Sequence, residues 1–157
     1  MVTSPATPSL IKEWKLVSVR DFLAPEDMDL LDTPGRAAEY WHRWIASPPT
    51  FRPEVEHLAV VILNTKLRAK GHQVVSVGTL NEAPGTPREI FRTAIVANAH
   101  AVVVMHNHPS GEPEPSEADR RATRKFREAG ELVGISLLDH VIIGHQRHFS
   151  FRDVGLL

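Results

Sequence analysis

The chain has 157 residues, of which 42% are hydrophobic and 24% charged, and its formal net charge is -1 at neutral pH. This composition is typical of one globular domain and excludes disorder driven by high net charge. The near-zero net charge lacks the basic excess typical of nucleic-acid-binding proteins, and the absence of cysteine excludes disulfides and thiolate metal ligands. The sequence shows neither a long apolar span nor a cationic start followed by an apolar run, so we expect a cytoplasmic protein without membrane contact.

The first part of the chain, residues 1–50, is expected to be an N-terminal extension ahead of a core domain over residues 51–157. Thr33-Pro34 has the form of an N-cap followed by proline at the first helical position. Apolar residues then recur at helical spacing, which predicts a helix over about residues 34–46.

The rest of the chain alternates between apolar runs of strand length and capped helices. Thr86 and Ser116 each resemble an N-cap with an acidic residue three positions later, which predicts two helices, and Gly130 stands where a left-handed residue would end the second one. The element order α-β-β-α-β-α-β-β predicts a single-domain α/β (α+β) fold with helices packed against a mixed sheet. The predicted strands are residues 58–63, 74–77, 101–105, 137–143 and 148–151.

Two histidines, His106 and His108, follow the third of these apolar runs. Residues separated by two positions at the end of a strand point to the same face, so both imidazoles can reach one ion. A turn rich in proline leads to Ser116, and the first turn of its helix carries Asp119, which returns a carboxylate to the histidines. Three protein ligands with a fourth position open for water are typical of catalytic zinc. The alternative is a chance pattern in a chain with nine histidines, but strand, turn and cap agree on a Zn²⁺ site.

The spacing from His106 through Ser116 to Asp119 is similar to the JAMM signature of MPN metallopeptidases, and the string HNHPSGEPEPSEAD resembles its bacterial RadC branch. The resemblance covers about residues 34–157. It implies a zinc-dependent hydrolase of amide or isopeptide bonds on an MPN/JAB-like fold, a curved mixed sheet flanked by helices. Further similar motifs are LNTK at residues 63–66, GTL at 78–80, PREIF at 87–91 and LLDH at 137–140.

The resemblance also implies roles for single residues. His106, His108 and Asp119 would be the metal ligands, and the Ser116 hydroxyl would help to stabilise the oxyanion, which is compatible with its role as N-cap. Water activation also needs a general base, a carboxylate near the metal but not bonded to it.

The family's catalytic glutamate lies just before the first long strand, where Glu56 stands, with Glu54 nearby. Glu89 is the alternative base, although its position in a capping box already gives it a structural role. We therefore favour Glu56 as the catalytic base.

Two features differ from the family's pattern. RadC relatives commonly carry an N-terminal helix-hairpin-helix segment that suggests DNA contact, and residues 1–50 show no such glycine-bearing hairpin. Thr86 stands where the family often has histidine. We expect a peptide or protein substrate; the alternatives are a DNA repair or anti-restriction factor and a non-catalytic MPN interaction module.

Two weaker signals leave alternatives open. Asp139 and His140 lie inside an apolar run and would form either a pair behind the metal or a satisfied core pair. The five basic residues between Arg120 and Arg127 form either a solvated face or a surface for an acidic partner or nucleic acid.

Overall fold

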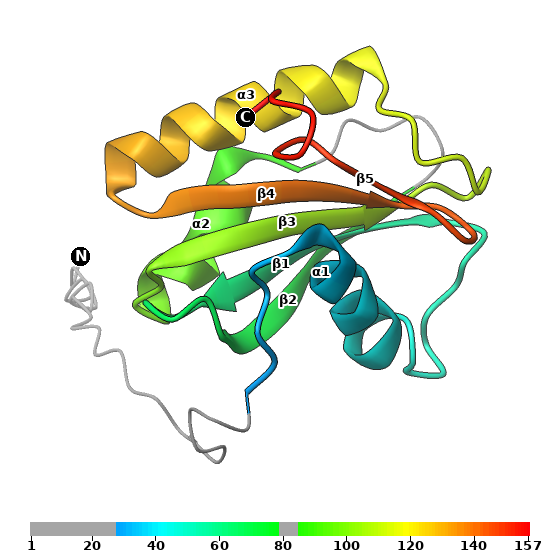
Figure 1. Cartoon of the computed structure of the whole chain (residues 1–157), viewed down its shortest axis with the longest axis horizontal. Coiled ribbons are helices and arrows are strands. Elements are labelled where there is room, and N and C mark those ends of the chain that lie inside the picture. Colours follow the sequence, from blue (N-terminus) through cyan, green and yellow to red (C-terminus); the bar gives the residue numbers. More distant parts are fainter. Residues whose placement is uncertain (1–27, 79–84) are drawn as a thin grey trace, which may run out of the picture.

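The computed structural model describes residues 28–78 and 85–157, so predictions for residues 1–27 lie outside it (Figure 1). Helices and strands follow one another in the predicted order, which confirms the α/β fold of a single domain. The elements are α1 (Pro34–Tyr40), the π-helical η2 (Trp41–Ile45), β1 (Glu56–Leu63), β2 (Ala69–Gly78), α2 (Pro87–Val96), β3 (Ala101–Asn107), α3 (Glu117–Val133), β4 (Ser136–Ile143) and β5 (His148–Ser150).

The five strands form one mixed sheet in the order β2-β1-β3-β4-β5. β3 and β4 are parallel, and the other neighbouring strands are antiparallel. The predicted hairpin of β1 and β2 is confirmed, but β2 begins at Ala69, earlier than its apolar run. The reason is that β2 is an edge strand and only partly buried, so its first half lacks the apolar pattern of a buried strand.

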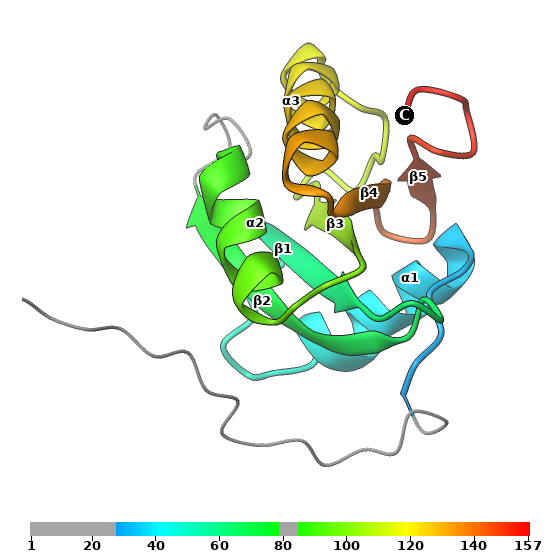
Figure 2. The same ribbon diagram turned by 90° about the vertical axis from the view of Figure 1, so that its left-hand side faces the viewer.

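Helices cover both faces of the sheet, with α1 on one side and α2 and α3 on the other (Figure 2). Trp41 packs in one core cluster with Val61 of β1, and Phe126 packs in the other with Val60. Successive strand residues point to opposite faces, so His106 of β3 shares the α3 face with Val104. None of the helices in the described ranges is long and apolar enough to cross a membrane.

The N-terminal helical segment begins as predicted at Thr33, whose side chain accepts a hydrogen bond from the Arg36 backbone N–H. It continues without a break through the π-helical turn to Ile45. Its apolar side belongs to the same core as the sheet. Trp44, in contrast, is 48% exposed, and its indole N–H donates to Asp29 at 2.6 Å.

The predicted end of α3 at Gly130 is wrong. Gly130 is a buried helical residue, and a Cβ there would lie 2.5 Å from the carbonyl oxygen of Ile135. This glycine therefore permits close approach of the chain that leads into β4. The left-handed residue that ends the helix is Gly134, with φ of 73°.

Candidate metal centre

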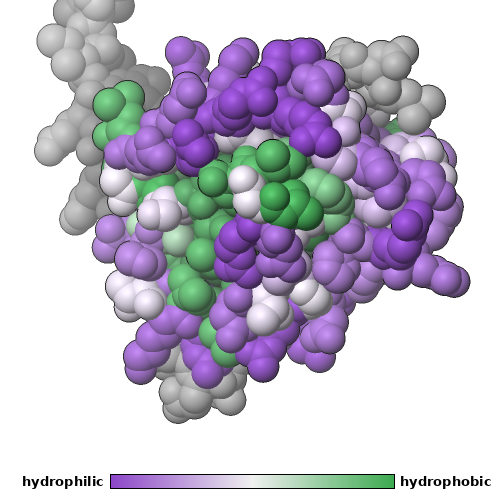
Figure 3. All heavy atoms as spheres, turned by 45° about the horizontal axis from the view of Figure 1, so that its top comes forward, coloured by the Kyte–Doolittle hydropathy of each residue, from purple (hydrophilic) through white to green (hydrophobic). Residues whose placement is uncertain are grey.

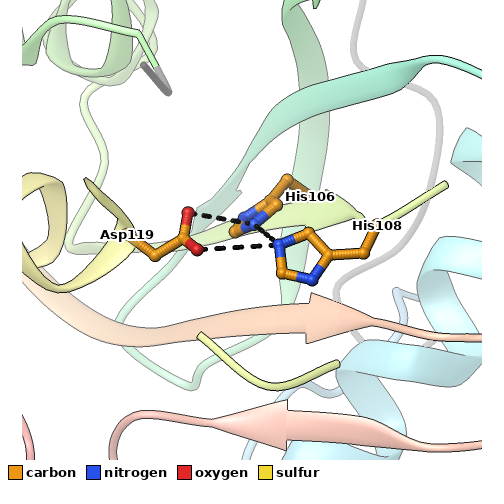
Figure 4. Close-up of side chains that lie close together, drawn as sticks. All are labelled: His106, His108 and Asp119. Atoms are coloured by element: carbon orange, nitrogen blue, oxygen red, sulfur yellow. Dashed lines mark hydrogen bonds and ion pairs between the residues drawn. The ribbon is translucent and has the colours of Figure 1, made fainter. Parts of the chain in front are cut away.

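His106, His108 and Asp119 converge on one point, as Figure 4 shows. The Nε2 atoms of the two histidines are 3.1 Å apart. The Asp119 carboxylate oxygens lie 3.3 Å from Nε2 of His106 and 3.6 Å from Nε2 of His108. These distances show that the three groups form a closely spaced cluster at the end of β3. His106 and Asp119 are buried.

The start of α3 aims the Asp119 carboxylate. Ser116 accepts a hydrogen bond from the Asp119 backbone N–H at 3.1 Å, and Oδ2 of Asp119 accepts the backbone N–H and the hydroxyl of Ser116 at 2.7 and 2.6 Å. This reciprocal capping box fixes the carboxylate of the third helical residue. The same hydrogen bonds that begin the helix therefore orient its acidic group toward β3.

The hydrogen bond of His108 on the far side of its ring determines which nitrogen faces the cluster. Its Nδ1 lies 2.8 Å from the carbonyl oxygen of Glu112. A carbonyl oxygen only accepts, so Nδ1 carries the hydrogen. In the neutral ring Nε2 then has a free lone pair, and this lone pair points toward His106 and Asp119.

A chain of three hydrogen bonds leads to the same result for His106. The Thr123 hydroxyl donates to the Asp119 carbonyl oxygen at 2.6 Å, so its oxygen accepts from Nδ1 of His140, 2.7 Å away. Nε2 of His140 is then an acceptor, and Nδ1 of His106 donates to it at 2.9 Å. His106 is left with a free lone pair on Nε2, the nitrogen that faces the cluster. A ligating histidine in a metal site is held in this way by the hydrogen bond of its other nitrogen.

The arrangement attracts a cation. Burial favours a neutral carboxyl, but hydrogen bonds with His106, His108 and Ser116 hold the pKa of Asp119 well below its usual value. The hydrogen bond with Asp119 in turn raises the pKa of His108. Two lone pairs 3.1 Å apart beside a carboxylate are stable together only when a positive charge lies among them, either a proton or a metal ion.

Glu56 lies beside this cluster. Leu58 of β1 pairs with His106, so the antiparallel register continued by two residues brings Glu56 opposite His108. Burial raises the pKa of Glu56, and the neighbouring charges of His106 and Asp119 act on it in opposite directions.

Glu89 has the capping role predicted for it. Its carboxylate accepts hydrogen bonds from the backbone N–H and the hydroxyl of Thr86 at 2.6 and 2.9 Å. These bonds lower the pKa of Glu89, and His106, His108 and Asp119 are not among the groups that shift it. The structure therefore separates the two candidate bases by their surroundings.

Asn107, between the two histidines, was missed by sequence reasoning. Its side-chain oxygen accepts from the His57 backbone N–H at 2.9 Å, and its amide donates to the carbonyl of Val55 at 3.0 Å. These bonds hold the backbone on both sides of Glu56. A polar residue at the end of a fully buried strand was the available signal, but its partners depend on a strand pairing that the sequence does not show.

Asp139 and His140 do not act as a pair. His140 lies behind His106, fully buried, and burial lowers its pKa well below the usual value. Asp139 points to the other face, where it accepts hydrogen bonds from the Ser150 hydroxyl at 2.6 Å and the Arg152 backbone N–H at 3.1 Å. Of the two alternatives, a position behind the candidate metal ligands applies to His140 alone, and Asp139 is a satisfied core residue.

A mixed sheet between helical layers, with a His/His/Asp cluster at the end of its central strand, defines a JAB (MPN)-type domain. The RadC-like JAB domain family matches residues 31–156, and the chain belongs to this family. This confirms the resemblance inferred from the sequence.

Three relatives show the extent of this similarity. A UPF0758 protein of Chlorobaculum parvum is 51% identical over 102 residues, which cover 65% of this chain and 46% of the relative. A UPF0758 protein of Thermotoga maritima is 49% identical over 104 residues, covering 66% and 47%. One of Desulfitobacterium hafniense is 39% identical over 140 residues, covering 77% and 62%. The chain thus spans about half the length of the curated relatives it matches.

Proposed function

We propose that this chain is a zinc-dependent hydrolase of peptide or isopeptide bonds, with His106, His108 and Asp119 as metal ligands. The convergence of two imidazole lone pairs and one carboxylate supports it. Zn²⁺ prefers such nitrogen and oxygen donors, and three protein ligands leave a position open. When bound, the ion supplies Lewis-acid chemistry, polarising a carbonyl and making water reactive near neutral pH.

Glu56 is the general base of the proposed reaction. Its half-buried carboxylate, with a raised pKa, is suited to accept a proton from the attacking water. The same group then delivers this proton to the leaving amine nitrogen, which regenerates the carboxylate. Asn107 holds the flanking backbone through His57 and Val55.

Ser116 is proposed to donate a hydrogen bond to the oxyanion. In the structure its hydroxyl donates to Asp119 at 2.6 Å, so the oxyanion role requires rotation of this hydroxyl. Its exposed position at the start of α3 leaves room for such a rotation. The cap is partly kept during it, because the Ser116 backbone N–H also donates to Asp119.

Metal analysis combined with cleavage assays tests this proposal. We expect one zinc ion per purified chain, and hydrolysis of peptide or isopeptide substrates that a chelator abolishes and Zn²⁺ restores. Two histidines and a carboxylate also suit Fe²⁺, so restoration by iron alone would contradict the zinc assignment. A zinc-loaded protein that cleaves no amide bond in a proteome-derived peptide pool or in isopeptide-linked substrates would contradict the hydrolase assignment.

A further inference from the structure

A pocket of about 400 Å³ is lined in part by Glu56, the residue beside the His106, His108 and Asp119 cluster. Its walls are the end of β2, the start of α2 and one side of α3. The size is within the range of pockets that take small ligands or side chains. Any substrate whose amide bond lies at the cluster therefore has neighbouring groups close to this pocket.

The α3 wall carries two cations one helical turn apart, Arg121 and Lys125, with Ala122 and Phe126 between and beside them. Both cationic side chains are exposed. They lie on the helix whose first turn carries Asp119, so the cations and the proposed metal ligand are held by one rigid element. Figure 3 shows hydrophilic side chains gathered along the upper edge of the visible face, where α3 lies.

Two other cations of the helix have a carboxylate nearby. Arg120 lies 3.8 Å from Glu117, and Arg127 lies 3.6 Å from Glu131. Within the described residues, Arg121 and Lys125 lie within 4 Å of no carboxylate, although two carboxylates line the same pocket.

Both pocket carboxylates have other roles. Glu89 is engaged by Thr86 in the cap of α2, and Glu56 lies beside the cluster. Among the described residues, no carboxylate is paired with the cations of the α3 wall, and their charges can attract a bound molecule.

We propose that Arg121 and Lys125 form a subsite for a carboxylate of the substrate, supplied by an Asp or Glu side chain near the cleaved bond or by a C-terminal carboxylate. The inference rests on the proposed hydrolase function and names its substrate class. Because both cations are exposed, their attraction for a carboxylate is screened, and a preference of about tenfold over a neutral group is expected.

Hexapeptide libraries with one position fixed as Glu, Gln or Lys, and with free or amidated C-termini, test the subsite on the zinc-loaded full chain. Cleavage is followed by mass spectrometry. Binding of the same libraries is measured by affinity selection on Glu56→Gln protein, which does not consume them. Preference for fixed Glu assigns the subsite to an acidic side chain, and preference for free over amidated termini assigns it to the C-terminus.

The variant Arg121→Gln with Lys125→Gln should lose this preference, and Arg121→Glu with Lys125→Glu should favour Lys. The matched control, Arg124→Gln with Arg127→Gln, changes two exposed cations of α3 outside the pocket lining and should behave as the parent. An equal response of the parent to all libraries, or a preference that the Gln variant retains, would overturn the subsite.

The two proposals fail separately. Carboxylate preference in binding without cleavage by the zinc-loaded parent leaves the subsite and removes the hydrolase. Cleavage without any preference for a carboxylate leaves the hydrolase and removes the subsite. Binding of a single-stranded DNA 12-mer that depends on Arg121 and Lys125, without any peptide preference, would assign these cations to phosphate and also overturn the subsite.

Discussion

The helices α2 and α3 begin with the same motif but place its carboxylate in different surroundings. Thr86 with Glu89 and Ser116 with Asp119 each form a complete capping box. Glu89 is partly exposed and contacts its own cap, whereas Asp119 is buried and lies 3.3 Å from His106. The motif determines where a helix begins; the strand across from it determines whether the carboxylate is available for chemistry.

The largest expected effect separates Glu56 from the α2 cap. Glu56→Gln keeps the shape of the side chain but cannot accept a proton, so turnover should fall by about 10²–10⁴-fold while zinc content is unchanged. Glu89→Gln should retain activity. Kinetics and metal analysis of both variants check this, with Glu54→Gln as an exposed control from the same segment. Normal turnover in Glu56→Gln with loss in Glu89→Gln would make the α2 cap the catalytic element.

The next effect tests whether the α3 cap does more than begin a helix. Ser116→Asp should keep the cap but place a negative charge where the oxyanion develops, so turnover should fall by about 10²–10³-fold in a folded protein. Ser116→Ala should combine a similar loss with a stability cost of about 0.5–2 kcal/mol. Circular dichroism and urea unfolding separate folding from activity. An Asp variant as active as the parent would reduce Ser116 to a cap, like Thr86.

The features predicted from the sequence are those encoded locally. Both capping boxes lie within four consecutive residues, and the common direction of His106 and His108 follows from the two-residue repeat of a strand. The predicted end of α3 was wrong because Gly130 and Gly134 both suit the end of a helix. Only the close approach of the Ile135 backbone to Gly130 distinguishes the two glycines.

The support behind the cluster depends on strand pairing. His140 reaches His106 because β3 and β4 are parallel with Val104 beside His140, and Asn107 brackets Glu56 because β1 and β3 are antiparallel. Unlike the β1–β2 hairpin, these pairings join strands that are far apart in the sequence, and no local pattern identifies them as neighbours. These contacts therefore required the structure.

Asp119→Asn tests the chemical difference between the two caps directly. The amide loses the negative charge but retains an oxygen for the cap, so helix α3 should still form. We expect zinc affinity to fall by at least about 100-fold, the upper end of the effect of residues that only support a ligand. Competition with a chelator of known affinity measures this. Glu89→Gln should bind zinc as the parent does, and an equal affinity of the Asp119→Asn variant would remove Asp119 from the ligand set.

The smallest effect is the pH dependence of stability in the zinc-free protein. The pKa of His108 is raised in the folded state by its hydrogen bond with Asp119. The stability that this hydrogen bond contributes is therefore fully present below the ordinary pKa of 6.5, and it is lost as pH rises through the pKa of the folded state. Burial lowers the pKa of His57, His72 and His140. These three rings are neutral in both states well above 6.5 and contribute no slope there.

Above pH 6.5 the free energy of unfolding without zinc should therefore fall, by up to about 1.4 kcal/mol per pH unit for one proton. With zinc it should rise instead, because ligand binding requires deprotonated histidines.

The α2 cap behaves differently, because its hydrogen bonds lower the pKa of Glu89. The stability that Glu89 contributes is therefore present above the ordinary pKa of 4.5 and is lost as pH falls through the pKa of the folded state. Urea unfolding between pH 3 and 9, with and without a chelator, measures these slopes. Asp119→Asn should flatten the slope of the zinc-free protein above pH 6.5, and Glu89→Gln should not. If the free energy of unfolding of the zinc-free parent does not change with pH in this range, no proton replaces the metal cation among His106, His108 and Asp119.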